Sequence, residues 1–197
     1  PKGSGFTPIL GLNLALLEDK LNIGVKYEFK TSMTITNETP AGKGFVIGMT
    51  ETGTPVEMFH DGEETNADMP AMLSIGLNYK FTDKFSTMIG YHTYFDKEAG
   101  WATIEGTDIS VIDKNYWELG IGLEYALSDK FLLSGGFLRA QSGVNDYYHD
   151  DMSYSLKSNT FGLGGAFRLN DMMLINFGGY KTVYTDATIS DPFTEAY

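Results

Sequence analysis

Apolar and polar residues alternate along several stretches of the chain with a period of two. The clearest stretch is 70–96, which begins with apolar Leu73, Ile75, Leu77, Tyr79 and Phe81 alternating with Ser74, Gly76, Asn78 and Lys80. A period of two predicts a β-strand with one apolar and one polar face. Thr82, Asp83 and Lys84 interrupt the alternation, which resumes at Phe85. The stretch is therefore expected to be a β-hairpin with a tight turn.

The same unit occurs along the whole chain, and an aspartate stands at each turn: Asp19, Asp83, Asp129 and Asp171. The predicted hairpins cover about 6–36, 70–96, 115–142 and 158–185, and the longer connections between them cover 37–69, 97–114 and 143–157. Repetition of one supersecondary unit predicts about eight antiparallel strands in a single segment, 1–197.

The unequal length of the connections distinguishes two classes of β-protein. A soluble sandwich covers its apolar face with a second sheet, and its two ends carry loops of similar kind. A transmembrane barrel has strands of about 9–11 residues, short turns at one end and long loops at the other. The sequence therefore predicts an all-β fold, a transmembrane antiparallel β-barrel of the bacterial outer membrane.

Aromatic residues support the barrel, because rings with a polar edge gather at both membrane interfaces. One set stands beside the short turns: Tyr79, Phe81, Phe85, Tyr125 and Phe131. A second set stands near the long loops: Tyr91, Tyr94, Phe95, Tyr116, Trp117, Tyr180 and Tyr184. Two aromatic girdles are predicted.

Small residues are frequent on the polar side of the alternation: Gly76, Gly90, Gly120, Gly122, Gly162 and Gly164. Such a lining leaves room, whereas side chains fill the interior of an eight-stranded barrel. The last residues, 191–197, do not alternate and are expected to be a loop. Together these features predict a segment of a larger barrel, with further strands before and after it. The paired glycines 135–136, 164–165 and 178–179 are expected to let the sheet curve.

Composition narrows the possible partners. The net charge is −12 and there is no cysteine, which argues against nucleic acid and excludes disulfides and cysteine nucleophiles. Acidic residues are concentrated in 51–68, which contains no Lys or Arg. A solvated loop is the expected reading, and a loop that holds divalent cations beside lipopolysaccharide phosphates is the alternative.

The polar residues expected to face the lumen are the candidate substrate-binding set: Lys26, Asn78, Lys80, Glu118, Glu124 and Arg168, with Glu28 and Asn176 beside them. One interpretation is a network of ion pairs that stiffens the wall and holds a plug. The other is that Lys or Arg binds the carboxylate of an amphipathic ligand.

Catalysis and metal binding are not expected, and no cofactor is predicted. A lipid-modifying barrel would need a Ser-His pair near the rim, and the histidines are His60, His92 and His149. His149 lies beside metal-compatible carboxylates, Asp146, Asp150 and Asp151. A solvated loop is the expected reading there.

Several strands resemble the FadL-type outer-membrane transporters of hydrophobic compounds. Residues 68–79, DMPAMLSIGLNY, resemble that family's pattern LP-A-x-x-x-x-G-x-x-Y, and similar strands follow at 117–125 (WELGIGLEY), 132–137 (LLSGGF) and 159–166 (NTFGLGGA). The Thr/Ser-Asp-Lys turns resemble Bacteroidetes-like versions. The resemblance covers most of the chain and corresponds to the C-terminal part of such a transporter.

The resemblance implies a barrel of about fourteen strands, an N-terminal plug and a sideways opening for hydrophobic ligands. It implies passive uptake of hydrophobic small molecules such as long-chain fatty acids, in contact with membrane lipid and lipopolysaccharide. The plug and the early strands are not in this sequence, so pocket residues that depend on them are not carried over. Those strands and the plug, or another outer-membrane protein, are the expected partners. A structural or adhesive barrel with acidic surface loops is the alternative function.

Overall fold

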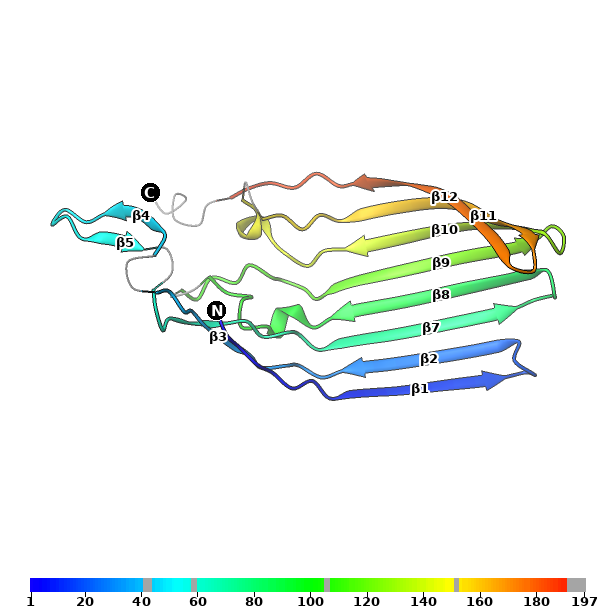
Figure 1. The fold of residues 1–197 in the computed structure, drawn as a ribbon, viewed down its shortest axis with the longest axis horizontal. Coiled ribbons are helices and arrows are strands. Elements are labelled where there is room, and N and C mark those ends of the chain that lie inside the picture. The colour runs from blue at the N-terminus through cyan, green and yellow to red at the C-terminus, as the bar shows by residue number, and fades with distance from the viewer. Residues whose placement is uncertain (41–43, 58–59, 105–106, 151–152, 191–197) are drawn as a thin grey trace.

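The computed structural model describes residues 1–40, 44–57, 60–104, 107–150 and 153–190. Its main element is one eight-stranded sheet in the order β1-β2-β7-β8-β9-β10-β11-β12, with every neighbouring pair antiparallel (Figure 1). The strands are β1 (Ile9–Leu16), β2 (Leu21–Glu28), β7 (Met72–Lys80), β8 (Phe85–Tyr94), β9 (Tyr116–Ala126), β10 (Phe131–Gln141), β11 (Ser158–Asn170) and β12 (Met173–Tyr184). The predicted all-β fold, with about eight antiparallel strands of a barrel wall, is confirmed.

Short turns join the hairpins at 17–20, 81–84, 127–130 and 171–172, each containing its aspartate. Two of them share one mechanism, in which a hydroxyl at the start of the turn accepts backbone N–H groups. The Thr82 hydroxyl accepts from the N–H of Lys84 (3.2 Å) and of Phe85 (3.0 Å). Ser128 accepts from Lys130 and Phe131 in the same way. The Thr/Ser-Asp-Lys sequence therefore encodes the turn.

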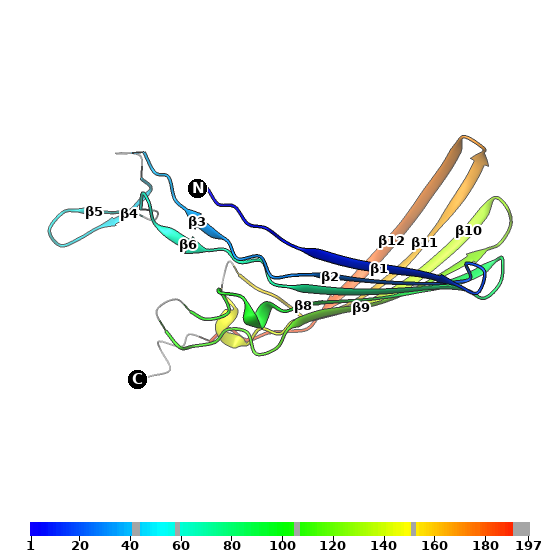
Figure 2. The same ribbon diagram turned by 90° about the horizontal axis from the view of Figure 1, so that it is seen from below.

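The sheet is curved and has two free edges. Figure 2 shows β10–β12 swung out of the direction followed by β1, β2 and β7–β9. Among the described residues, β1 and β12 each pair on one side only. An open, coiled sheet of this kind is a sector of a barrel wall rather than a closed barrel.

One face of the large sheet is apolar, and no second layer built from the described residues covers it. Its side chains include Leu12, Val25, Ile75, Ile121, Leu133, Leu163 and Phe177, which are between 37% and 78% exposed. Within the described residues the buried apolar cluster lies in the loops instead, around Ala102, Val111 and Ile112. A contiguous exposed apolar face excludes a soluble sandwich and is what lipid contact requires. None of the described residues forms a helix long and apolar enough to cross a membrane.

The long connections have structure of their own that alternation did not predict. β3 (Thr34–Thr36) pairs with β6 (Glu64–Asn66), and β4 (Val46–Met49) pairs with β5 (Pro55–Glu57). Residues 34–36, which the pattern assigned to the first hairpin, thus belong to a separate small sheet. The later loops contain short 3-10 helices, η1 (Asp96–Glu98) and η2 (Asp146–Tyr148). The predicted terminal loop, 191–197, lies outside the described residues.

The strand register corrects the predicted girdle at the loop end. Tyr94, Tyr116, Tyr180 and Tyr184 lie on the polar face, since their cross-strand partners are Met72, Tyr94, Gly162 and Ser158. Their phenols belong there because period-two position, not proximity to a loop, decides the face. On the apolar face Tyr91 pairs with Trp117 at 6.3 Å, and at the turn end Phe81 stacks on Phe85 at 5.2 Å between ring centroids.

Candidate ligand-binding wall

The six predicted site residues lie on one face of the sheet, called here the polar face. Backbone register connects them through alternating positions of all the strands from β2 to β11: Lys26, Asn78, Lys80, Glu118, Glu124 and Arg168. Glu28 and Asn176 lie on the same face. The opposite positions carry the exposed apolar side chains.

The predicted residues do not form one cluster. Two rows of polar side chains cross the strands instead. The loop-side row is Lys26, Ser74, His92 and Glu118, each opposite the next. The turn-side row is Lys80, Ser86, Glu124 and Ser134. Six residues separate the rows along β7, which corresponds to about 20 Å. Asn78 lies between the rows, and Arg168 lies nearer the turns.

Each member of the loop-side row has a short contact, and Ser74 and His92 contact each other. The Ser74 hydroxyl and Nδ1 of His92 are 3.0 Å apart. Lys26 Nζ lies 2.6 Å from Glu28 Oε1, and the Tyr116 hydroxyl donates to Glu118 Oε1 at 2.6 Å. Lys26 and Glu118 thus have partners already. The Ser74–His92 pair keeps its remaining hydrogen-bonding capacity, since neither side chain forms another hydrogen bond among the described residues.

Glycines lie beside the loop-side row, one on each of four adjacent strands: Gly24, Gly76, Gly90 and Gly120. A Cβ built on Gly76 or Gly90 meets nothing within 4 Å, and on Gly24 or Gly120 it makes only ordinary contacts. None has a positive φ. Neither backbone conformation nor packing in the described chain requires glycine here. Gly24, Gly76 and Gly90 form the floor of a hollow of about 570 Å³ that Lys26, Ser74 and His92 border.

Gly164 and Gly165 of β11, in contrast, are required by steric contacts. A Cβ on Gly165 would lie 2.6 Å from the Leu132 carbonyl oxygen and 2.9 Å from the Phe177 ring. A Cβ on Gly164 would lie 3.0 Å from the Phe177 carbonyl oxygen. Close approach of neighbouring backbones therefore requires glycine where the sheet swings round, as the predicted role in curvature demands.

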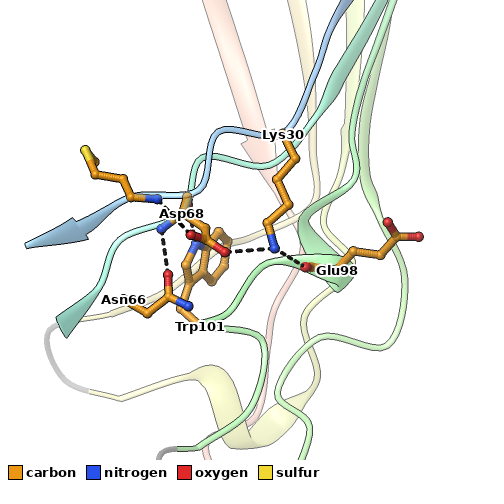
Figure 3. Close-up of polar contacts among 6 residues, drawn as sticks. Lys30, Asn66, Asp68, Glu98 and Trp101 are labelled. Carbon is orange, nitrogen blue, oxygen red and sulfur yellow. Dashed lines mark hydrogen bonds and ion pairs between the residues drawn. The ribbon is translucent and has the colours of Figure 1, made fainter. Parts of the chain in front are cut away.

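The loop end of the wall is held by an ion pair in the connection before β7 (Figure 3). Lys30 Nζ lies 2.8 Å from Asp68 Oδ2 and donates to the Glu98 carbonyl oxygen at 3.2 Å. Asp68 Oδ1 accepts from the Met33 N–H, and the Asp68 carbonyl accepts from Trp101 Nε1. The hydrogen bond from Lys30 and that from Met33 lower the pKa of Asp68. The cluster connects the two ends of the β2–β7 connection to the β8–β9 connection.

The same residues correct the prediction of a uniformly solvated acidic loop. The Asp68 side chain is only 8% exposed and has a cationic partner, Lys30, from outside 51–68. His149 is also buried, at 7% exposure, and its Nδ1 has no partner among the described residues. It packs against the Tyr148 ring, so it belongs to the loop core rather than to solvent.

No metal site is assembled in the part of the chain that the structure describes, because no three His, Cys, Asp or Glu side chains come together there. Asp151, one of the metal-compatible residues near His149, lies outside that part. A larger hollow, about 1260 Å³, lies among the loops between Lys2, Thr34 and Asp68. It is open and away from both polar rows.

Ser74 and Tyr116 are the wall residues that the predicted set omitted, and His92 was considered only as a catalytic candidate. Ser74 and Tyr116 each occupy a polar-face position in the alternation. The period of two was therefore a sufficient signal to assign both residues to the polar face. Ser74 contacts His92 across the β7–β8 hairpin, and Tyr116 contacts Glu118 two residues further along β9.

Comparisons with known proteins give structural similarity alone, since no protein-family model and no curated protein matches the sequence. The CymD monoaromatic hydrocarbon channel is similar with a TM-score of 0.56 and 16% identity, over 92% of this chain and 47% of that one. The toluene transporter TodX of Pseudomonas putida is similar with a TM-score of 0.50 and 17% identity, over 89% and 43%. The predicted resemblance is confirmed at the level of fold. The chain has the fold of FadL-type hydrocarbon channels, and it spans less than half the length of those it matches.

Proposed function

We propose that the chain is a wall segment of an outer-membrane channel for passive uptake of small hydrophobic compounds. The apolar face contacts lipid, and the polar face borders the lumen. One observation carries the proposal: an apolar face without a covering layer lies back to back with a face lined by glycine and polar residues. A wall of this kind separates lipid from an aqueous interior.

The open glycine floor supports a conduit over a solid structural barrel. Small barrels fill their interior with side chains. Here Gly76 and Gly90 leave space above the wall that no side chain of the described residues occupies. A hydrophobic solute needs such space and a surface without large polar side chains.

The cargo class follows from the solutes named for the similar channels and from the resemblance. Those channels are described as carrying monoaromatic hydrocarbons and toluene. Long-chain fatty acids are the second cargo that the resemblance implies. Lys26 of the loop-side row is one cation for the carboxylate of a fatty acid, but Lys26 already forms an ion pair with Glu28. We therefore place aromatic hydrocarbons before fatty acids.

Initial uptake rates in whole cells test the proposal, because an intact lipopolysaccharide layer is the barrier that such a channel overcomes. Cells of a host without its own hydrophobic-compound channel would produce the complete protein. Uptake of labelled toluene and of labelled oleate at low concentration would then be compared. Toluene uptake above the background of host cells is expected.

A matched pair of variants separates transport from mere presence in the membrane. Gly76→Val and Gly90→Val together narrow the lumen side, whereas Gly179→Val adds the same side chain to the apolar face. A Cβ at Gly179 also meets nothing within 4 Å. Uptake is expected to fall in the first variant only. Equal uptake by cells with and without the protein would contradict a channel.

A structural or adhesive role has one observation in its favour, the hairpin formed by β4 and β5. It projects beyond the large sheet (Figure 1), and Phe45, Ile47 and Met49 on it are at least 60% exposed. Exposed apolar side chains on a projecting loop are typical of a binding surface. Replacing 46–56 by a short Gly-Ser linker tests this role. Loss of cell attachment with unchanged toluene uptake would favour adhesion as a second activity.

A further inference from the structure

We propose that the loop-side row forms a binding site for a neutral, planar ring that carries one hydroxyl group, such as a phenol. The inference rests on the proposed channel and specifies the ligand class of its wall. Its core is the Ser74–His92 pair, with the hollow of about 570 Å³ beside it.

The Ser74–His92 pair is suited to a hydroxyl because it can both donate and accept. If Ser74 donates to Nδ1 of His92, then Nε2 carries the proton and is a free donor, and the serine oxygen is a free acceptor. If His92 donates instead, Ser74 is the free donor and Nε2 the free acceptor. A hydroxyl group of the ligand matches either arrangement, whereas a hydrocarbon matches neither.

Charge around the pair disfavours an acid. Lys26, Glu28 and Glu118 are the ionised residues of this part of the face, one cation against two anions. Lys26 is already held by Glu28 at 2.6 Å. A ligand carboxylate would therefore approach a site of net negative charge without a free cation. A neutral hydroxyl meets no such penalty.

The shape of the hollow favours a flat body. Gly24, Gly76 and Gly90 lie side by side on β2, β7 and β8, so the floor is bare backbone over about 10 Å across the strands. Because side chains are missing there, a ring can lie against the peptide planes. Its hydroxyl then reaches the row of Ser74 and His92, one pleat nearer the loops.

The test uses three fluorinated probes of similar size: 4-fluorophenol, fluorobenzene and 4-fluorobenzoate. Binding to the complete protein in detergent micelles is followed by 19F NMR. Partition into micelles is subtracted with empty micelles. Binding is expected to be tightest for 4-fluorophenol. Ser74→Ala should weaken 4-fluorophenol binding about three- to tenfold, the effect of one lost hydrogen bond, and leave fluorobenzene unchanged.

Two controls make the site specific. Ser86→Ala changes a serine of the turn-side row on the same face and should have no effect. Gly76→Val fills the floor and should abolish binding of both neutral probes, whereas Gly179→Val on the apolar face should not. If Gly76→Val does not fold, as judged by heat-modifiable migration in gels, the smaller Gly90→Ser replaces it.

Several results would overturn the inference. Equal binding of 4-fluorophenol and fluorobenzene, or insensitivity to Ser74→Ala, would show that the pair does not recognise a hydroxyl. Preference for 4-fluorobenzoate would show an anion site. Labelling of Ser74 by a fluorophosphonate would make it a nucleophile. In each case, toluene uptake by cells tests the proposed channel function separately. Hydroxyl-specific binding without toluene uptake would contradict the channel function and leave the binding site standing.

Discussion

Lys30 and Asp68 form an ion pair, with 2.8 Å between Nζ and Oδ2, that joins the chain leaving β2 to the chain entering β7 (Figure 3). The pair also contacts the next loop, through the Glu98 carbonyl and the Trp101 indole. One aspartate therefore holds the two ends of the β2–β7 connection and the β8–β9 connection together at the loop end of the wall. The contribution of this junction to loop order can therefore be tested by substituting Asp68.

Asp68→Asn is expected to loosen this junction without unfolding the sheet. The substitution removes the hydrogen bond between Lys30 and Asp68 Oδ2. The Met33 N–H, which donates to Asp68 Oδ1 at 3.0 Å, should then exchange with solvent about three- to tenfold faster, the effect of one lost hydrogen bond. Hydrogen exchange followed by mass spectrometry measures this. Amides in the middle of β9 serve as the internal control and should keep their rates. Unchanged exchange at Met33 would show that the ion pair does not anchor the loop.

Acid should release the same junction. The pKa of Asp68 is lowered by its hydrogen bonds to Lys30 and Met33, so its folded pKa lies below the unfolded value of about 4. Its stabilisation is therefore fully present above about pH 4 and is lost as pH falls through the folded pKa. Trp101 fluorescence in a Trp117→Phe background should report the release, and Asp68→Asn should remove the transition.

Asp96 is expected to respond to acid in the opposite way to Asp68. Burial raises its pKa, although its carboxylate accepts from the Tyr116 N–H at 2.9 Å. Its protonation begins at higher pH and relieves the cost of a buried charge rather than weakening the fold. If the fluorescence transition persists in Asp68→Asn and disappears in Asp96→Asn, Asp96 rather than Asp68 causes the acid response, and the prediction for Asp68 is wrong.

Glycines with and without steric contacts should respond oppositely to alanine. Gly165→Ala should destabilise the barrel by about 1–3 kcal/mol, because its Cβ collides with the Leu132 carbonyl and the Phe177 ring. Gly76→Ala should be neutral or slightly stabilising, since its Cβ meets open space and glycine is a poor strand residue. Urea unfolding in lipid vesicles compares the two. Similar losses in both would refute the distinction.

The apolar face should reject charge if it contacts lipid. Ile121 is 42% exposed near the middle of β9. Ile121→Arg is expected to cost about 2–4 kcal/mol of unfolding free energy in a bilayer. Glu124→Arg, on the polar face of the same strand, should cost much less. An inverted order in vesicle refolding titrations would place the lumen on the other side.

The first turn is strained, which a glycine should relieve. Leu17, Glu18 and Asp19 have φ of 56°, 53° and 62°, the left-handed region that ordinary residues avoid. Glu18→Gly should stabilise the protein by about 1 kcal/mol, the usual left-handed penalty less the greater freedom of unfolded glycine. Asp83→Gly, in a turn without positive φ, should not stabilise. Urea midpoints of both variants measure the difference.

Strands and turns could be predicted from the sequence because both are local. Alternation around Gly76 and the Thr82 turn needs only neighbours along the chain, and the face of each wall residue follows from parity. What escaped prediction depends on contacts across the sequence. The Ser74–His92 contact requires strand register, and the burial of Asp68 and His149 requires loops that meet in space. Tyr94 and Tyr116 were misplaced because closeness to a loop was given more weight than parity.

The unobstructed floor at Gly24, Gly76 and Gly90 separates what the channel accepts from how it folds. Since no backbone or side-chain neighbour requires glycine at Gly76 or Gly90, residue size there is free to change without disturbing the surrounding strands. The same scaffold can therefore acquire a narrower or differently shaped passage one methyl group at a time. Selectivity in this wall is an adjustable property, and redesign for a new solute should begin at these three positions.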